Sequence, residues 1–381
     1  MEYIIFHKDY PVLSVSLDDG FSIDKINKIL SHDRLPPGLF KKQLNLSDLN
    51  YWFFSRGIPA DRKELSVILD VNNRKNQQEL IVRNLGLGLV DYYWIKDEKD
   101  SRKWGEVNFF QNAFSQQGEN IYIGDFRDTE LLPNQFNPNN LSSGMLPKKW
   151  IKVGETLYMI KGSELQNYQE PFNEVVVSKY LDNLSIDHVH YDLHWHRERP
   201  YSKCPNMLDP DEELVHAYYV KEIAEKDNRA SYLSHYVNCC QIMGLDKNIK
   251  TDLDNMILVD YLTANTDRHW SNFGVIRDVE TLQAKRLAPI YDNGAAFFAK
   301  FASIDIPRMR DKVKCQSFRA TQQENIKLVT DFSLLKNKAV SSLPDLLEAG
   351  LNEKFISKER KNTIIFRTKQ RIRHVKNMDV Q

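Results

Sequence analysis

Asn-Thr-Asp-Arg-His-Trp-Ser-Asn at residues 265–272 and Ala-Pro-Ile-Tyr-Asp-Asn-Gly at residues 288–294 are the two stretches that decide the fold. Apolar residues recur at helical spacing over residues 252–265, which predicts a helix that ends at the start of the first stretch. Asp252 can cap the start of this helix. Asp267 is therefore expected in the loop at its C-terminal end.

A short β-hairpin is predicted between the two stretches. Residues 273–277 and 286–291 have the composition of strands, and a turn at residues 278–281 separates them. A hairpin brings its two ends together, so Asn272 and Asp292 are expected to be neighbours in space.

Phosphoryl transfer needs side chains of these types. One carboxylate accepts or orients the attacking hydroxyl, while an amide oxygen and a second carboxylate hold Mg²⁺ against the phosphates. Mg²⁺ often takes only one or two side-chain ligands, because phosphates and water fill its other positions. In the alternative interpretation, Asp267 caps a turn and residues 292–294 form an ordinary β-turn. The hairpin between them favours the functional interpretation.

The two stretches resemble the HipA-like serine/threonine kinases, whose catalytic loop carries Asp-x-His-x-x-Asn and whose metal loop reads Pro-x-Tyr-Asp. The matching residues of this chain are Asp267, His269, Asn272, Pro289, Tyr291 and Asp292. The first stretch is also similar to the phosphatidylinositol 3- and 4-kinases, distant relatives in the same fold. The resemblance covers residues 140–300 well and residues 1–120 only in outline.

The resemblance implies an ATP- and Mg²⁺-dependent kinase. Asp267 would be the catalytic base, with His269 beside it in the catalytic loop. Asn272 and Asp292 would bind Mg²⁺.

A kinase fold also requires a strand lysine for the α- and β-phosphates and a helix glutamate that holds it. Lys161 ends a predicted strand, and Glu174 lies near the start of a predicted helix 13 residues later. This order suits the ion pair. The alternative is a surface lysine at a strand end and a glutamate that is favourable in the first turn of a helix.

The phosphate loop should precede Lys161, and residues 141–150 are the candidate. Backbone N–H groups near Ser142, Ser143 and Gly144 can cradle phosphate oxygens, and Lys148 or Lys149 can add charge. The loop has a single glycine and is not a Gly-x-Gly-x-x-Gly motif. HipA-like kinases have a related loop with a serine that can be autophosphorylated, which implies this part for Ser142 or Ser143.

The predicted strand over residues 189–196 and the stretch 201–208 are expected to lead into the hinge, where backbone groups near residues 204–207, Met207 among them, would bind adenine. Upstream, histidines occupy positions 188, 190, 194 and 196. They raise the alternative of a zinc site, because residues 190, 192, 194 and 196 would share one strand face. No Cys or Glu lies at ligand spacing, so polar strand residues are the preferred interpretation.

Composition narrows the class of protein. The chain has 381 residues, enough for about two domains, and 52 Lys plus Arg balance 52 Asp plus Glu. This balance favours neither nucleic acid nor an anionic membrane as a partner. Its four cysteines match no common zinc spacing or disulfide framework, which fits a reducing compartment. The start of the chain lacks the pattern of a signal peptide, and no long apolar run is present, so a cytoplasmic protein is expected.

The order of the elements indicates an α+β, bilobal protein-kinase-like fold with a strand-rich N-lobe and a mainly helical C-lobe. Residues 1–120 are expected to form an accessory part of the N-lobe. Residues 121–208 would form the nucleotide-binding N-lobe with the phosphate loop, the Lys/Glu pair and the hinge. Residues 209–381 would form the helical C-lobe with the catalytic and metal-binding loops. Helical patterns are predicted over residues 22–30, 61–86, 171–181, 211–225, 230–244 and 252–265.

Residues 358–376 interleave apolar and basic residues, which predicts a terminal amphipathic helix with a solvated basic face. Binding of nucleic acid or an acidic partner by this face is the alternative, and direct nucleic-acid binding is not expected.

Three functions follow from these patterns. The first is a HipA-like serine/threonine protein kinase that transfers the ATP γ-phosphate to a protein hydroxyl. For this function the resemblance implies a toxin, a DNA-binding antitoxin partner and autophosphorylation. The second is a lipid or small-molecule kinase of the same fold, and the third is a nucleotide-binding pseudokinase. The full set of site residues favours an enzyme, but the sequence does not identify the molecule that accepts the phosphate.

Overall fold

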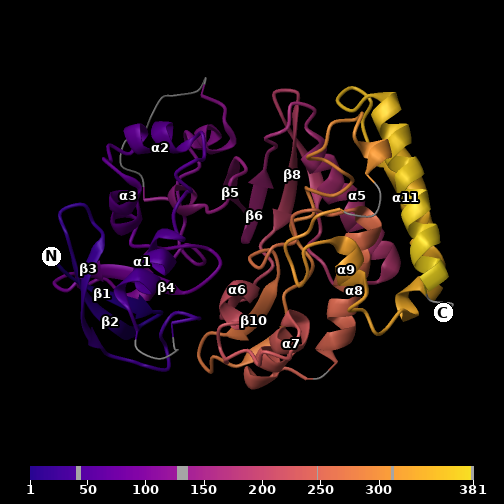
Figure 1. Cartoon of the computed structure of the whole chain (residues 1–381). Coiled ribbons are helices and arrows are strands. Elements are labelled where there is room, and N and C mark those ends of the chain that lie inside the picture. The colour runs from indigo at the N-terminus through magenta and orange to yellow at the C-terminus, as the bar shows by residue number, and fades with distance from the viewer. Residues whose placement is uncertain (40–43, 127–135, 247, 310–312, 379–381) are drawn as a thin grey trace.

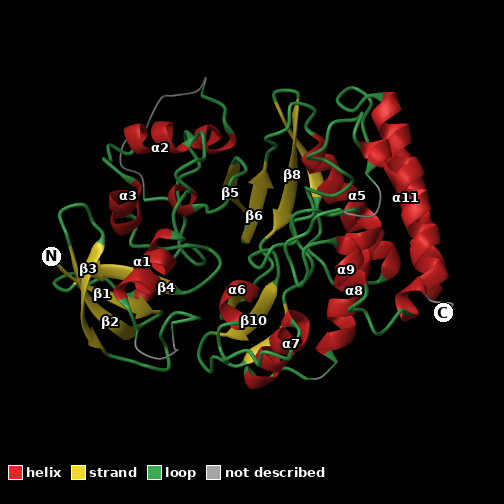
Figure 2. Cartoon of the chain, viewed as in Figure 1, coloured by secondary structure: helices red, strands yellow, loops and turns green. Residues whose placement is uncertain are grey.

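The computed structural model of the chain describes residues 1–39, 44–126, 136–246, 248–309 and 313–378 (Figure 1). Strands β1 to β4 lie at one side with the N-terminus, the sheet that contains β5, β6 and β8 lies in the middle, and the long helix α11 lies at the opposite side. Helices predominate on that opposite side (Figure 2). Across the described ranges, no helix combines the length and the apolar character needed to cross a membrane.

The first sheet is antiparallel, with the strand order β3-β2-β1-β4. Its strands are β1 (Glu2–His7), β2 (Tyr10–Leu17), β3 (Ile23–Ile29) and β4 (Tyr93–Asp97). Buried residues alternate along β1, so one face of the sheet forms a core. Helix α1 (Leu46–Phe54) covers this face with Leu49, Trp52 and Phe53.

The helix predicted over residues 22–30 is wrong, because β3 occupies this segment. Asp18 forms the turn before it: Asp18 Oδ1 accepts hydrogen bonds from Gly20 N and Ser22 N, both at 2.8 Å. The turn directs the chain back along β2. Pairing with a neighbouring strand therefore outweighs the local helical spacing.

The helix predicted over residues 61–86 is divided in two, α2 (Leu65–Val71) and α3 (Gln77–Arg83). Asn76 starts the second one, because its side chain accepts a hydrogen bond from Glu79 N at 2.7 Å and so caps α3. Three short elements follow along the chain: α4 (Trp104–Val107) and the 3₁₀ helices η1 (Glu119–Ile123) and η2 (Pro138–Leu141).

The second sheet is antiparallel, with the order β5-β6-β8-β7. Its strands are β5 (Lys148–Val153), β6 (Thr156–Lys161), β7 (Asp192–His196) and β8 (Arg199–Pro205). Helix α5 (Gln169–Leu184) connects β6 to β7 and extends beyond the predicted range of 171–181 at both ends. It is buried along most of its length, because it packs between this sheet and α10 (Leu343–Gly350).

The third sheet has the order β11-β10-β9, with β9 (Glu212–His216), β10 (Gly274–Asp278) and β11 (Ala284–Leu287). The expected hairpin is therefore present. The helix predicted over residues 211–225 is wrong, because β9 and the four-residue helix α6 (Ala217–Val220) replace it. Gly274 allows β10 to approach β9 closely, since a Cβ at this position would lie 2.3 Å from Val215 O.

The helices around the largest core are α7 (Tyr232–Ile242), α8 (Ile249–Thr263), α9 (Gln322–Ile326) and α10, with α11 (Lys358–Met378) along the outside. Three 3₁₀ helices connect them: η3 (Ile306–Arg308), η4 (Ser333–Lys336) and η5 (Lys338–Ser342). Helix α8 begins three residues before the predicted start, so Asp252 lies inside its first turn and is not its cap.

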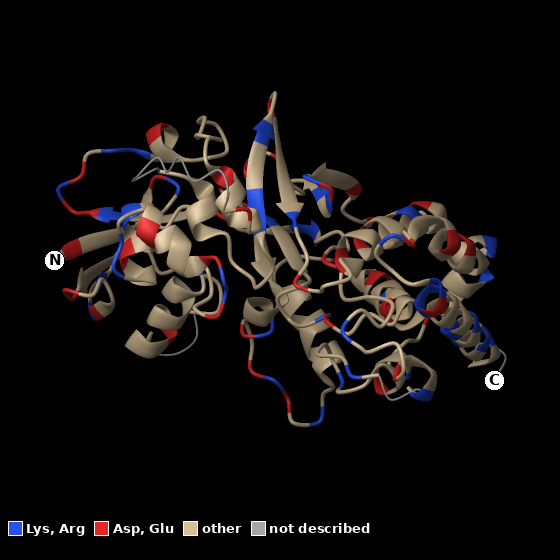
Figure 3. Cartoon of the chain, turned by 90° about the horizontal axis from the view of Figure 1, so that it is seen from above, with Lys and Arg blue, Asp and Glu red and all other residues tan. Residues whose placement is uncertain are grey.

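Helix α11 carries basic residues along its length (Figure 3). The expectation of a solvated basic face is wrong for Arg360 and Arg371, which are buried. Arg371 Nε donates to Tyr261 O at 2.6 Å, and Arg360 Nη2 donates to Phe298 O at 2.9 Å. These two arginines therefore attach α11 to the rest of the chain.

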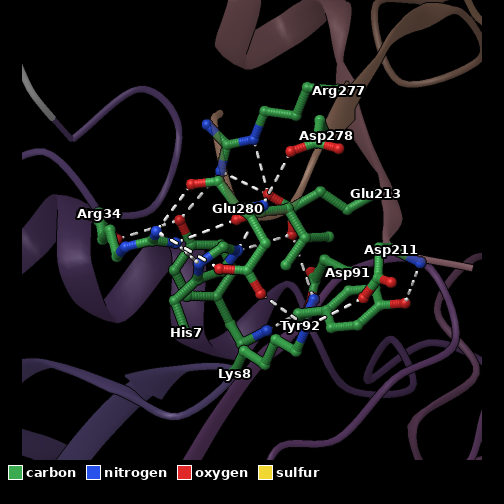
Figure 4. A network of polar contacts seen from close by, with 12 residues as sticks. His7, Lys8, Arg34, Asp91, Tyr92, Asp211, Glu213, Arg277, Asp278 and Glu280 are labelled. Atoms are coloured by element: carbon green, nitrogen blue, oxygen red, sulfur yellow. Dashed lines mark hydrogen bonds and ion pairs between the residues drawn. The ribbon is translucent and has the colours of Figure 1, made fainter. Parts of the chain in front are cut away.

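A buried polar network joins the first sheet to the third (Figure 4). Glu213 of β9 lies at its centre: His7 Nε2 is 3.1 Å from both carboxylate oxygens, and Arg277 Nε donates to Oε1 at 2.6 Å. Arg277 Nη2 donates to Tyr93 OH at 3.1 Å. Arg34 Nη1 lies 3.0 Å from His7 Nδ1. Because β1, β4, β9 and β10 all contribute, the network fixes the two sheets against each other.

Acidification is expected to weaken this network. Burial raises the pKa of Glu213, but the charge of Arg277 and the contacts of His7 outweigh burial and lower the pKa to about 2. The folded value lies below the usual value of 4.5. The carboxylate therefore contributes about 3 kcal/mol of stability above pH ~4.5, and this contribution is lost as the pH falls toward 2.

Urea unfolding of the wild type and of Glu213→Gln at several pH values measures this effect. The difference in unfolding free energy should be about 3 kcal/mol at pH 7 and should shrink as the pH falls below ~4.5. A difference that stays constant as the pH falls would show that the Glu213 charge does not stabilise the contact.

Candidate active site

The predicted catalytic loop, residues 265–272, follows α8, whose C-cap residue Ala264 adopts a left-handed conformation with φ of 51°. The loop is internally bonded: His269 N donates to Asp267 O at 2.7 Å, and Asn272 N donates to His269 O at 2.8 Å. Asn272 Nδ2 donates to Asp267 O at 2.8 Å, so its amide oxygen points away from that carbonyl. The Asp267 carboxylate is 30% exposed and therefore accessible.

Arg268 ties the catalytic loop to the end of the hairpin. Its side chain is 1% exposed, and Nη1 donates to Asn272 O at 2.8 Å and to Tyr291 O at 2.5 Å. Asp260 of α8 holds the same guanidinium through Nε at 3.0 Å and Nη2 at 3.0 Å. One side chain thus reaches both hairpin ends, and the expectation that these ends lie side by side is confirmed.

Lys161, at the C-terminal end of β6 in the second sheet, contacts two carboxylates. Lys161 Nζ lies 2.7 Å from Glu174 Oε1 and 2.5 Å from Asp292 Oδ1. Glu174 Oε2 also accepts a hydrogen bond from Asn293 N at 2.8 Å. The Lys/Glu contact expected from the sequence is therefore formed, and the residue after Asp292 is bonded to the same glutamate.

The charges around Asp292 keep it ionised. Burial raises the pKa of this carboxyl, but the positive charges of Lys161 and Lys148 outweigh burial and hold the pKa well below its usual range. Burial also opposes the charged form of Lys161, whereas Asp292 and Glu174 raise its pKa above the usual value. Asp292 adopts a left-handed backbone conformation with φ of 58°, which is rare for a residue with a side chain. Lys161 and Asp292 are thus both charged, and Asp292 has a strained backbone conformation.

Residues 142–144 form a loop that Lys148 joins to this pair, because Lys148 interacts electrostatically with both Lys161 and Asp292. Ser142 is buried, and its Oγ has no hydrogen-bond partner within the described residues. Ser143 is exposed, and Gly144 has a φ of 90°. A Cβ at Gly144 would lie 2.6 Å from Lys148 Nζ, so the lysine extends over the loop in the space that a side chain would fill.

The structure distinguishes between Lys148 and Lys149. Lys148 pairs with Lys161 across β5 and β6, whereas Lys149 Nζ donates to Glu119 Oε1 at 2.9 Å and to Asn120 Oδ1 at 3.0 Å on η1. Burial and the nearby charge of Lys161 lower the pKa of Lys148 to about 8. Lys148 is therefore the lysine at the site, and an anion placed there would stabilise its charged form.

Arg62 binds the backbone of the loop at residues 142–144, and sequence analysis missed this residue. Arg62 Nη1 donates to Ser142 O at 2.9 Å, and Nη2 donates to Tyr122 O at 2.9 Å. The residue is 2% exposed, and its charge is balanced by Glu64, whose Oε2 lies 3.1 Å from Arg62 Nε. Arg62 lies 80 residues before the loop, so no local pattern in the sequence indicates this contact.

The predicted hinge, residues 204–207, spans the end of β8 and lies beside a small apolar cluster. Its buried members are Val175, Val189, Tyr191 and Cys204, and Met159, Leu193, Met207 and Tyr291 pack against them. Asn206 N donates to Leu157 O at 2.8 Å, which holds the chain as it leaves the sheet. Burial raises the pKa of the Cys204 thiol to about 12, so it is a neutral apolar side chain. Tyr191 places the cluster next to the pair, because its ring centroid lies 5.6 Å from Lys161 Nζ and its hydroxyl oxygen accepts a hydrogen bond from Asp292 N at 3.5 Å.

The segment after Asp292 is held by three further polar residues that sequence analysis missed. Asn173 Nδ2 donates to Gly294 O at 2.8 Å and to Ala296 O at 2.7 Å, and Gln169 Nε2 donates to Phe297 O at 3.0 Å. Arg360 Nε donates in turn to Gln169 Oε1 at 2.8 Å. Helix α5 thus positions both Lys161, through Glu174, and this segment.

Lys300 belongs to the same segment and reaches the catalytic loop. Its Nζ lies 3.1 Å from Asp267 Oδ2, and it is half exposed. A positive charge therefore lies directly beside the accessible carboxylate. The sequence offered no motif that marks this lysine.

The four histidines near β7 do not form one group. His196 Nε2 lies 2.8 Å from Asp125 Oδ2, while His188 and His190 lie at the other end of the segment, close to Asp182. The face of residues 190, 192, 194 and 196 considered for zinc is therefore not assembled as a site.

Comparison with known proteins gives a fold but no family. No protein-family model matches the chain, and no curated protein matches it in sequence. The solved structure of the Shewanella oneidensis MR-1 toxin–antitoxin system HipA, HipB and its operator DNA contains a chain that matches with a TM-score of 0.54 and 11% identity, over 98% of this chain and 97% of that one. The Helicobacter pylori proinflammatory kinase CtkA matches with a TM-score of 0.46 and 15% identity, over 61% of this chain and 94% of that one. The chain therefore has a kinase-like fold that mixes sheets and helices.

Proposed function

We propose that this chain is an ATP- and Mg²⁺-dependent kinase of the HipA-like type that transfers the γ-phosphate to a serine or threonine hydroxyl of a protein. The observation that carries the proposal is Lys161 Nζ, which lies 2.7 Å from Glu174 and 2.5 Å from Asp292. A kinase requires this lysine and this glutamate together, next to the carboxylate that binds the metal.

The donor set fits Mg²⁺. Asn272 and Asp292 supply an amide oxygen and an ionised carboxylate, and Arg268 holds their backbones together. Oxygen donors of this kind are those that Mg²⁺ takes from proteins. When bound, the ion would neutralise charge on the phosphates of ATP.

The other residues have roles that follow from their positions. Asp267 is the accessible carboxylate and would accept the proton of the attacking hydroxyl, with His269 in the same loop. Lys300 places a positive charge 3.1 Å from Asp267, close to where transferred phosphate would pass. Residues 142–144 and Lys148 would cradle the phosphates, and Met207 would contact adenine at the edge of the apolar cluster.

The division into lobes is part of the same proposal. Residues 121–208, with the second sheet, would form the nucleotide-binding lobe, and residues 209–381 would form the lobe with the catalytic and metal-binding loops. Residues 1–120 would be an accessory part, fixed by the network around Glu213. A DNA-binding antitoxin partner and a toxin role belong to the proposal as well, because the fold resembles HipA over nearly its whole length.

Transfer of label from γ-labelled ATP tests the proposal. Purified chain with Mg²⁺ is incubated alone and with cell extract, beside Asp267→Asn and the control Asp252→Asn, an exposed aspartate on the helix before the catalytic loop. Label should appear on a protein, and Asp267→Asn should reduce transfer by about 100-fold or more, because a general base contributes about this much. The control should transfer label like the wild type.

Two results would overturn this assignment. Label that appears only in lipid or in small molecules would favour a lipid or small-molecule kinase of the same fold. Nucleotide binding without any transfer would favour a pseudokinase, in which Asp267 has only a structural role.

The pH dependence of ATP binding tests the role of Lys148. Its pKa of about 8 in the free protein means that it is charged below this pH, and a bound triphosphate would raise the pKa by stabilising the charge. The affinity of the wild type should therefore fall as the pH rises above ~8. Lys148→Met should bind ATP about tenfold more weakly at pH 7 and lose this dependence.

Calorimetric titration with Mg²⁺–ATP at several pH values measures both effects. Lys152→Met is the matched control, because Lys152 lies on the same strand four residues further from the loop. Both variants experience the same ionisation of the nucleotide, so their difference isolates the charge of Lys148. An unchanged pH dependence in Lys148→Met would remove Lys148 from the phosphate site.

A further inference from the structure

A group of three metal-binding side chains lies at the C-terminal end of α5, outside the site described above. Asp182 Oδ1 is 3.7 Å from His188 Nε2 and 3.4 Å from His190 Nδ1, and all three atoms lie within 4.8 Å of one another. Four ligands around Zn²⁺ at about 2.1 Å are separated by about 3.4 Å. The two contacts of Asp182 are therefore close to the separation that a tetrahedral site requires.

The local bonds orient His188 for this role. His188 Nδ1 lies 2.8 Å from Ile186 O, and a bond to this carbonyl places the proton on Nδ1 and leaves the lone pair on Nε2. A backbone acceptor on the other ring nitrogen is the usual support for a histidine that binds metal. Ser178 Oγ, 3.2 Å from His188 Nε2, occupies that lone pair in the absence of metal, and it also accepts a hydrogen bond from Tyr191 N at 3.1 Å.

The ligands differ in exposure in a way that suits entry of an ion. The side chain of His188 is 3% exposed, whereas those of Asp182 and His190 are 49% and 68% exposed. An ion can therefore arrive from solvent at Asp182 and His190 and be fixed by the buried His188. An exposed His–Asp contact is a weak interaction without metal.

We propose that Asp182, His188 and His190 bind one Zn²⁺ ion, with the fourth position open to water. Two imidazoles and one carboxylate are borderline ligands that suit Zn²⁺ better than Mg²⁺ or Ca²⁺, which prefer oxygen. Three protein ligands and one open position form a common zinc arrangement. This site is separate from the proposed Mg²⁺ site in both its residues and its chemistry.

The site lies where it can affect the nucleotide site. Val189 N donates to Ile290 O at 2.9 Å, and Ile290 N donates to Asp187 O at 3.1 Å, so the two histidines flank a residue bonded to the segment that leads from β11 to Asp292. Asp182 lies on the helix that carries Glu174. Bound zinc would therefore join the end of α5 to the segment that positions Asp292, and would stabilise the folded chain.

Binding of Zn²⁺ to the metal-free full chain in excess Mg²⁺ tests the proposal without any measurement of kinase activity. One equivalent should bind with a dissociation constant of about 1 μM or tighter, and Co²⁺ in its place should give the absorption of a tetrahedral site. Zinc should also raise the unfolding temperature. His190→Ala and Asp182→Asn should each weaken binding by about 100-fold.

His194→Ala is the matched control, because His194 lies on neighbouring β7 and is not a member of the group. It should bind zinc like the wild type. All three variants replace residues that are not buried, and unfolding temperatures without zinc that match the wild type will show that they fold. Absence of zinc binding by the wild type, or binding by His190→Ala and Asp182→Asn as tight as that of the wild type, would overturn the assignment. Because the readout is metal binding, either result leaves the kinase proposal untouched.

Discussion

Asp292→Asn should lower the rate of phosphoryl transfer by about 1000-fold or more. The substitution keeps the shape of the side chain and removes the negative charge that would hold Mg²⁺ against the phosphates, an interaction worth several kcal/mol in the transition state. It also removes one of the two carboxylates on Lys161, at 2.5 Å, and leaves Glu174 as the remaining one. Measurement of kcat/KM for label transfer and of nucleotide affinity with and without Mg²⁺ checks the result.

The nucleotide affinities with and without Mg²⁺ distinguish an effect on metal binding from an effect on nucleotide binding. The wild type should bind ATP more tightly with Mg²⁺ than with a chelator, and Asp292→Asn should lose most of this difference. Asp278→Asn is the control, because Asp278 lies at the opposite end of the same hairpin, where Asn can still accept the turn bonds of Thr281. If folded Asp292→Asn transfers phosphate within tenfold of the wild type, Asp292 is not a metal ligand.

The part of the site that could be predicted from sequence is the part built from short-range elements. Asn272 and Asp292 are joined by one hairpin, and Lys161 and Glu174 lie 13 residues apart on one strand and the helix that follows it, so their proximity follows from local structure. Arg62 and Arg360 could not be predicted in this way. They act on Ser142 and Phe298 across 80 and 62 residues, and a buried arginine has no local signature.

The incorrect helix over residues 211–225 has a related cause. Glu212 and Glu213 of β9 are both buried, at 1% exposure each, although charged side chains usually face solvent. Their partners come from distant strands: Arg277 and His7 bind Glu213, and Arg286 binds Glu212 at 2.7 Å. Buried charge is stable only with such partners, so the strand could be recognised only once the sheets were assembled. The proposed zinc-binding group was missed for a different reason, because Asp182 comes from a helix and not from the strand face that was considered.

Arg268→Met should destabilise the folded chain by about 4–5 kcal/mol, the largest stability effect expected here. The substitution leaves Asp260 as a buried carboxylate without its partner, which costs about 3–5 kcal/mol. It also removes the donors to Asn272 O and Tyr291 O, so the proposed catalytic loop and the proposed metal-binding loop lose their common support. The midpoint of urea unfolding should fall with little change in slope.

Two further variants distinguish the effect of leaving Asp260 without a charged partner from the effect of shortening an arginine to methionine. Arg319→Met, at an exposed arginine, should change the unfolding free energy by no more than about 0.5 kcal/mol. Asp260→Asn/Arg268→Met should be more stable than Arg268→Met alone, because no buried charge then lacks a partner. If the double variant is no more stable than the single one, the buried charge of Asp260 is not what Arg268 balances. The loss would then lie in the two hydrogen bonds that join the loops.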